Sequence, residues 1–98
     1  MHIKTKDLIE IIDILKINIQ QTFPDEVYVD EDDFYWQIKE DQLYNLEQTP
    51  DVDELGQLSD DWSDLLRLKK KDAIPISHDL NRLAAILQIV RKKSIGIW

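Results

Sequence analysis

Apolar residues near the N-terminus recur with the spacing of an α-helix, and this predicts a helix over about residues 6–22. One face of this helix carries Leu8, Ile11, Ile12, Leu15 and Ile19. Thr5 has the side chain of a helix N-cap, and Pro24 ends the helix because proline has no N–H. Ile14 and Ile17 lie on the other side of the helix, and we expect both to be buried within the fold.

The next stretch changes from helical spacing to the composition of a β-strand. The runs VYV and FYWQI are rich in β-branched and aromatic residues, and EDD between them favours a turn. A short hairpin of these two runs is one interpretation, and irregular chain is the other. In a strand, Phe34, Trp36 and Ile38 point to one face while Tyr35 and Gln37 point to the opposite face. KEDQLYNLEQTP then predicts a brief helical turn that ends at Pro50.

Two more helices are predicted in the C-terminal half. The first begins near Asp53 or at Ser59 and ends around Lys71. Its buried stripe consists of Leu55, Leu58, Trp62, Leu65 and Leu66. The second follows Pro75 and uses Ser77 as its N-cap. Its inward face consists of Leu80, Leu83, Ala84, Leu87 and Val90.

These patterns predict a mainly α fold, with three principal helices and a short β-hairpin or extended segment after helix one. The alternative is an α+β fold with a small antiparallel sheet. A chain of 98 residues, of which 43% are hydrophobic, fits a single domain over residues 1–98. The chain has no apolar run long enough to span a membrane and no signal-peptide cleavage pattern, so we expect a cytoplasmic protein without a membrane partner.

Acidic residues are concentrated in the middle of the chain. Residues 24–64 contain 15 Asp or Glu and a single Lys, for a net charge of −14, whereas residues 65–98 carry +6 and residues 1–23 are neutral. The acidic segment repels a phosphate backbone and attracts a basic protein surface. We therefore expect no nucleic-acid partner. A solvated face that keeps a small protein in solution is the alternative interpretation.

Catalytic and cofactor signatures are missing from the sequence. With no cysteine, thiolate chemistry and Cys-ligated metals are excluded, and His2 and His78 lie in no metal-ligand motif. Ser77, His78 and Asp79 are adjacent, but neighbouring side chains at a helix start diverge and cannot form a triad. The acidic run from Asp30 fails the spacing of a calcium-binding EF-hand loop. We expect no cofactor, no metal and no enzymatic activity.

Two stretches, YWQIKEDQLYNLEQTPDVDELGQLSDDWSDLLRL and ISHDLNRLAAILQIV, carry a resemblance. They look like a group of small uncharacterised bacterial proteins with YYW-x-I, then LY, then GQLSDDW, and finally a Leu-x-x-LAA-x-L helix. The similarity covers roughly residues 35–90, and GQLSDDW is its most specific part. It implies a common fold and no particular activity. Size and charge alone also resemble those of acidic helical bacteriocin-immunity proteins.

The sequence therefore predicts a non-enzymatic protein-binding module, of an immunity, antitoxin or inhibitor type, that docks a basic partner surface. Acidic residues beside an exposed aromatic combine steering with anchoring. The predicted partner-binding residues are Asp30, Asp32, Asp33, Tyr35, Asp60, Asp61 and Asp64. Self-association is the alternative, because the −14 middle of one copy can meet the +6 end of another. An enzyme that uses carboxylates is a third alternative.

Overall fold

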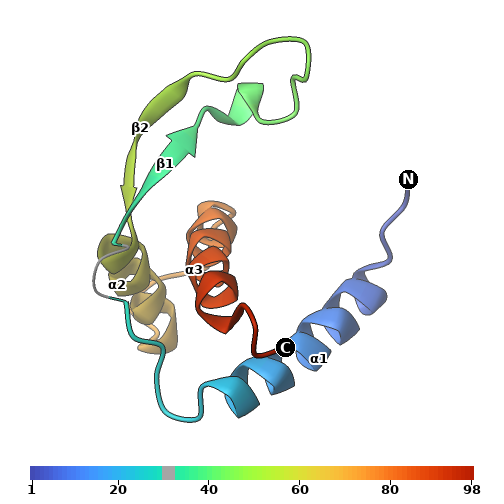
Figure 1. The fold of residues 1–98 in the computed structure, drawn as a ribbon, viewed down its shortest axis with the longest axis vertical. Helices are drawn as coiled ribbons and strands as arrows, with labels where there is room; N and C mark the ends of the chain where they lie inside the picture. Colours follow the sequence, from blue (N-terminus) through green and yellow to red (C-terminus); the bar gives the residue numbers. More distant parts are fainter. Residues whose placement is uncertain (30–32) are drawn as a thin grey trace. The chain divides into compact units, whose positions relative to one another are not determined.

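The computed structural model describes residues 1–29 and 33–98. Its elements in chain order are α1 (Thr5–Thr22), β1 (Phe34–Ile38), the 3₁₀ turn η1 (Glu40–Gln42), β2 (Val52–Gln57), α2 (Leu58–Lys69) and α3 (His78–Ser94), shown in Figure 1. The prediction of a mainly α fold with three principal helices and a short hairpin after the first is confirmed.

The chain falls into two compact units. One consists of Met1–Tyr28 and Val90–Trp98, and the other of Val29–Ile89, so α3 contributes to both. The single domain over residues 1–98 stays a prediction. The hairpin, α2 and α3 up to Ile89 lie within the second unit.

The first helix has the predicted bounds but not the predicted environment. Thr5 is its first residue, so its assignment as N-cap is wrong, and the C=O of Lys4 accepts the N–H of Leu8 at 3.1 Å. None of the described residues of α1 is buried. Only Ile19 of the predicted stripe is half-buried, and both Ile14 and Ile17 are exposed. The spacing places these apolar residues on one face of α1, and this face is exposed except at Ile19.

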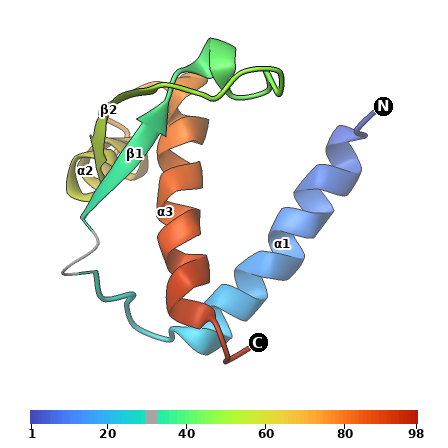
Figure 2. The ribbon, with the colours of Figure 1, turned by 45° about the horizontal axis from the view of Figure 1, so that its top comes forward.

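The hairpin joins strands that lie far apart in the sequence. β1 pairs antiparallel with β2, and Tyr35 lies opposite Gly56 and Trp36 opposite Leu55. Figure 2 shows the two strands side by side, with η1 in the connection at the end of the hairpin away from α2. The VYV run forms no strand in the described chain, so the predicted pairing of VYV with FYWQI is wrong. Of the two starts predicted for the next helix, the one near Asp53 is wrong, because this residue lies in β2. The one at Ser59 agrees to within one residue with α2, which begins at Leu58.

The buried face of α2 largely agrees with the prediction, whereas that of α3 does not. In α2, Leu58 is buried and Leu65 and Leu66 are half-buried as predicted, but Trp62 is exposed. Leu55 lies in β2. In α3, Val90 is buried as predicted and Ile89 joins it, but the remaining predicted inward residues, Leu80, Leu83, Ala84 and Leu87, are exposed. The half-buried or buried positions Asp79, Arg82, Ile86 and Ile89 follow the three- and four-residue spacing of one helix face. This face is polar at its start, because it meets acidic residues of α2.

Candidate functional site

Asp33 closes the N-terminus of α2 from a distant point in the sequence. Its Oδ1 accepts the N–H of Ser59 at 2.9 Å, and its Oδ2 accepts the Gln57 side-chain amide at 2.8 Å and the Ser59 hydroxyl at 3.1 Å. Its backbone C=O also accepts the N–H of Leu58 at 2.6 Å. Gln57, which occupies the N-cap position, makes no side-chain cap bond within the described chain. Asp33 therefore satisfies donors that a local N-cap would otherwise satisfy.

The electrostatics of Asp33 agree with this structural role. The Gln57 amide is the largest cause that lowers the pKa of Asp33 below its ordinary value of 3.8, and the Ser59 N–H and hydroxyl act in the same direction. Partial desolvation opposes them. Hydrogen bonds to the ionised form stabilise it, so the carboxylate stays charged while its oxygens are used inside the fold.

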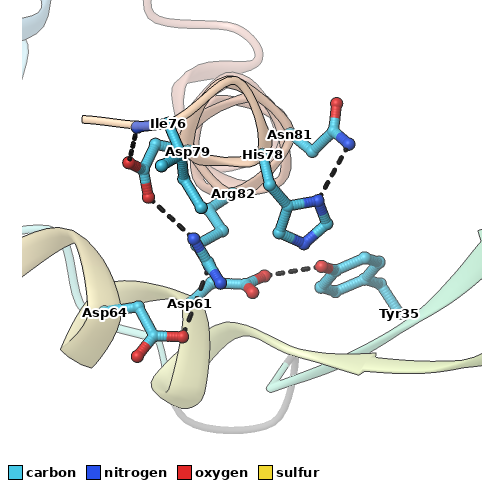
Figure 3. Close-up of polar contacts among 8 residues, drawn as sticks. All are labelled: Tyr35, Asp61, Asp64, Ile76, His78, Asp79, Asn81 and Arg82. Carbon is cyan, nitrogen blue, oxygen red and sulfur yellow. Dashed lines mark hydrogen bonds and ion pairs between the residues drawn. The ribbon is translucent and has the colours of Figure 1, made fainter. Parts of the chain in front are cut away.

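Tyr35 points into the second unit and binds α2. Its hydroxyl donates to Asp61 Oδ2 at 2.5 Å, as Figure 3 shows. The ring lies against Gly56, its cross-strand partner, and a Cβ at Gly56 would come within 2.6 Å of Tyr35 Cε1. Only glycine leaves space for the aromatic ring at this position. Tyr35 is consequently half-buried, and the expectation of an exposed aromatic at this residue is wrong.

Arg82 joins α3 to α2 through two carboxylates. Its Nη1 lies 2.7 Å from Asp79 Oδ1 and its Nε lies 3.3 Å from Asp64 Oδ2 (Figure 3). The Arg82 side chain is only 20% exposed. Asp79 Oδ2 also accepts the N–H of Ile76 at 2.9 Å, and this bond is the largest cause that lowers the pKa of Asp79, with Arg82 adding to it. The single positive charge of Arg82 is therefore shared by the carboxylates of Asp64 and Asp79, and the three groups together keep a net charge of −1.

His78 stands beside this network without completing a catalytic triad. The side-chain amide of Asn81 lies 3.2 Å from His78 Nδ1, so this nitrogen is paired with Asn81 and not with Asp79 (Figure 3). No group of three His, Asp or Glu side chains in the described residues could hold a metal ion. The polar network is arranged to hold α2, α3 and the hairpin together.

The predicted partner-binding residues thus have different environments. Tyr35 and the carboxylates of Asp33, Asp61 and Asp64 are held by bonds within the chain. Asp60 is exposed at the start of α2. Asp30 and Asp32 lie outside the described residues. Among the acidic residues of this set that the structure describes, only Asp60 is fully exposed, and Asp33, Asp61 and Asp64 are half-buried.

A different surface is formed by the opposite face of the hairpin. Trp36 is 72% exposed, Phe34 is 62% exposed, and Leu55, directly opposite Trp36, is 55% exposed. Ile38 is exposed on the same face. We call Phe34, Trp36, Ile38 and Leu55 the aromatic face. Strand alternation in FYWQI separates this face from Tyr35, but it does not tell which of the two faces solvent.

Comparison of the chain with family models, with curated proteins and with solved structures finds no match. The resemblance carried by GQLSDDW stays a prediction. Within the described residues, no helix combines the length and the apolar character needed to cross a membrane.

Proposed function

We propose that this chain is a non-enzymatic, acidic protein-binding module that docks a basic partner surface, in the manner of an immunity, antitoxin or inhibitor protein. The proposal includes a protein partner, no nucleic acid, and a cytoplasmic location. The observation that carries it is the aromatic face, where two large aromatic side chains are exposed in the most acidic part of the sequence.

The aromatic face has the chemistry of an interaction anchor. Soluble monomeric proteins rarely expose large contiguous apolar patches, and those that they do expose often serve as interaction sites. Tryptophan is enriched among the residues that dominate binding energy, because its large ring loses much water-exposed area when it enters a pocket. Trp36 supplies such a ring on the hairpin, with the exposed side chains of Phe34 and Leu55 on the same face.

The exposed acidic residues would speed the association with the partner, whereas the aromatic face would anchor the complex. Glu40 and Asp41 follow β1 directly and are exposed, as is Asp60. With a net charge of −14 over residues 24–64, they attract a basic surface and raise the association rate in a salt-dependent way. The engaged acids, Asp33, Asp61 and Asp64, support this surface by holding the hairpin, α2 and α3 in place.

The proposal is tested by capturing partners from the native cell at low salt with the wild type, Trp36→Ser and Tyr44→Ser. Tyr44 is the matched control, because it is 88% exposed and lies outside the aromatic face. We expect one protein to be lost with Trp36→Ser and retained with Tyr44→Ser. With that protein purified, Trp36→Ser should weaken binding about 30-fold or more, the effect of a hot-spot residue. Equal affinity of a specific partner for wild type and Trp36→Ser would contradict the proposal.

Self-association is a second candidate, and the exposure of α1 favours it. Most of the stability of a helix in a protein comes from packing of its apolar face, so the exposed isoleucines and leucines of α1 would gain from a surface that covers them. Light scattering at low and high salt decides this candidate. A monomer at both salt concentrations removes it.

A further inference from the structure

The phase of the hairpin ladder can be derived from one hydrogen bond. Because Phe34 pairs with Gln57, Asp33 lies directly opposite Leu58, and the N–H of Leu58 bonds the C=O of Asp33 at 2.6 Å. In antiparallel sheets, directly opposed residues alternate between hydrogen-bonded and non-hydrogen-bonded pairs. Tyr35 and Gln37 therefore direct their backbone groups toward β2. Phe34 and Trp36 direct theirs to the outer edge of β1.

This outer edge is open to pairing. The backbones of Phe34 and Trp36 make no hydrogen bond to another residue that the structure describes, apart from their place in the two-stranded ladder. Natural sheets protect such edges with charged side chains, prolines or covering segments. The strand Phe34–Ile38 contains no charged residue and no proline. The unpaired N–H and C=O groups thus lie next to the exposed Trp36 ring without the usual protection.

We propose that the outer edge of β1 accepts an extended, positively charged segment of a partner protein as a third strand of the sheet. This inference rests on the proposed function and specifies how the partner binds. Strand addition supplies backbone hydrogen bonds for affinity, and alternate side chains supply specificity. Phe34 and Trp36 offer two N–H and two C=O groups for these bonds.

Side-chain alternation determines the sequence pattern of the added strand. A residue opposite Trp36 places its side chain on the aromatic face, beside Trp36 and Phe34, so apolar residues belong at alternate positions. The positions between them are free to carry Lys or Arg. The exposed Glu40 and Asp41 at the end of β1 provide opposite charge for these residues.

The same charges argue against a second copy of this chain as the added strand. Pairing of β1 with β1 of another copy would bring together two segments that each carry a net charge of −14. The strand itself is uncharged, so the repulsion comes from the acidic residues that flank it, because like charges brought close together oppose association. A basic segment is attracted by the same negative charges that repel a second copy of the chain.

The test uses a seven-residue synthetic peptide of alternating Lys and Val, the same peptide N-methylated on its Val residues, the same peptide N-methylated on its Lys residues, and a Glu–Val counterpart. Titration calorimetry at low salt measures affinity, and amide hydrogen exchange by NMR locates the binding edge. We expect the Lys–Val peptide to bind. Methylation of the set of amides that faces β1 should weaken it about tenfold or more, because backbone bonds are lost, and methylation of the other set should not. The Glu–Val peptide should bind at least tenfold more weakly.

Hydrogen exchange separates the two proposals. On binding, the amides of Phe34 and Trp36 should exchange at least tenfold more slowly, while those of Leu55 and Gln57, on the outer edge of β2, remain unchanged. Binding of the cellular partner that depends on Trp36 without slowed exchange at Phe34 and Trp36 overturns strand addition and leaves the proposed function standing. Failure of the Lys–Val peptide to bind, or slowed exchange at Leu55 and Gln57 instead, also overturns strand addition.

Discussion

Replacing Gly56 by alanine places a methyl group where the Tyr35 ring lies. The added Cβ would come within 2.6 Å of Tyr35 Cε1, and the buried backbone of Gly56 sits in a paired strand and cannot give way freely. The tyrosine ring therefore has to move. When it moves, its hydroxyl loses the 2.5 Å hydrogen bond to Asp61 that joins the hairpin to α2.

The magnitude follows from three contributions. Overpacking costs about 1–3 kcal/mol. Loss of the hydrogen bond between Tyr35 and Asp61 costs about 1 kcal/mol more. Alanine restricts the unfolded chain and returns about 0.4–1 kcal/mol, because Gly56 does not have a positive φ. We expect Gly56→Ala to lower the free energy of unfolding by about 2 kcal/mol, which corresponds to a melting temperature about 10 °C lower.

In the background of Tyr35→Ala, we expect Gly56→Ala to change the free energy of unfolding in the opposite direction. In Tyr35→Ala the ring is absent, so Gly56→Ala should raise the free energy of unfolding by about 0.5 kcal/mol through the unfolded chain. Urea unfolding followed by far-UV circular dichroism, on wild type, both single variants and the double variant, measures the coupling. If Gly56→Ala is equally destabilising with and without the Tyr35 ring, the proposed packing of this ring over glycine is refuted.

Three further predictions concern the capping, ion-pair and helix-end features of the fold. Because the folded pKa of Asp33 lies below 3.8, its contribution to stability is present above that value and is lost as pH falls through the folded pKa; urea midpoints between pH 5 and pH 2 should show a smaller acid loss in Asp33→Asn than in wild type. Arg82→Leu should lower the urea midpoint clearly, whereas Lys6→Ala, which breaks an exposed pair with Glu10, should change stability by less than about 0.5 kcal/mol; equal effects would contradict the role given to Arg82. At the end of α2, Lys71 has a φ of 62°, so Lys71→Gly should stabilise the protein by about 1 kcal/mol in thermal unfolding, and no change would mean that the left-handed conformation is not strained.

The bounds of the helices could be predicted from the local sequence pattern. The period of apolar residues and Pro24 located α1 to within one residue, and Pro75 with the following polar residues located the start of α3. These signals act within a few residues, so a single sequence displays them directly. The same period failed for the buried face of α3. Arg82, on the side of α3 that begins with Asp79, binds Asp64 of α2, whereas Leu80 and Leu83 lie on the exposed side.

The second strand of the hairpin and the role of Asp33 could not be predicted from the local sequence pattern. VDELGQ has no alternation of apolar and polar residues, and it becomes a strand because FYWQI pairs with it. Asp33 looks like one more acid in an acidic run, but it serves as the cap of a helix 26 residues away. Neither role could be deduced from neighbouring residues, because each partner is distant in the sequence.

By itself, the sequence determined the helical elements, the fold class, the concentration of acidic residues in the middle of the chain and the separation of FYWQI into two faces. Only the tertiary structure decided which face is exposed, because a glycine on β2 makes room for Tyr35 and so directs Phe34 and Trp36 outward. It also decided which carboxylates are engaged within the fold. The physical reason is the same in both cases: exposure and pairing depend on distant partners, whereas helix formation depends on near neighbours.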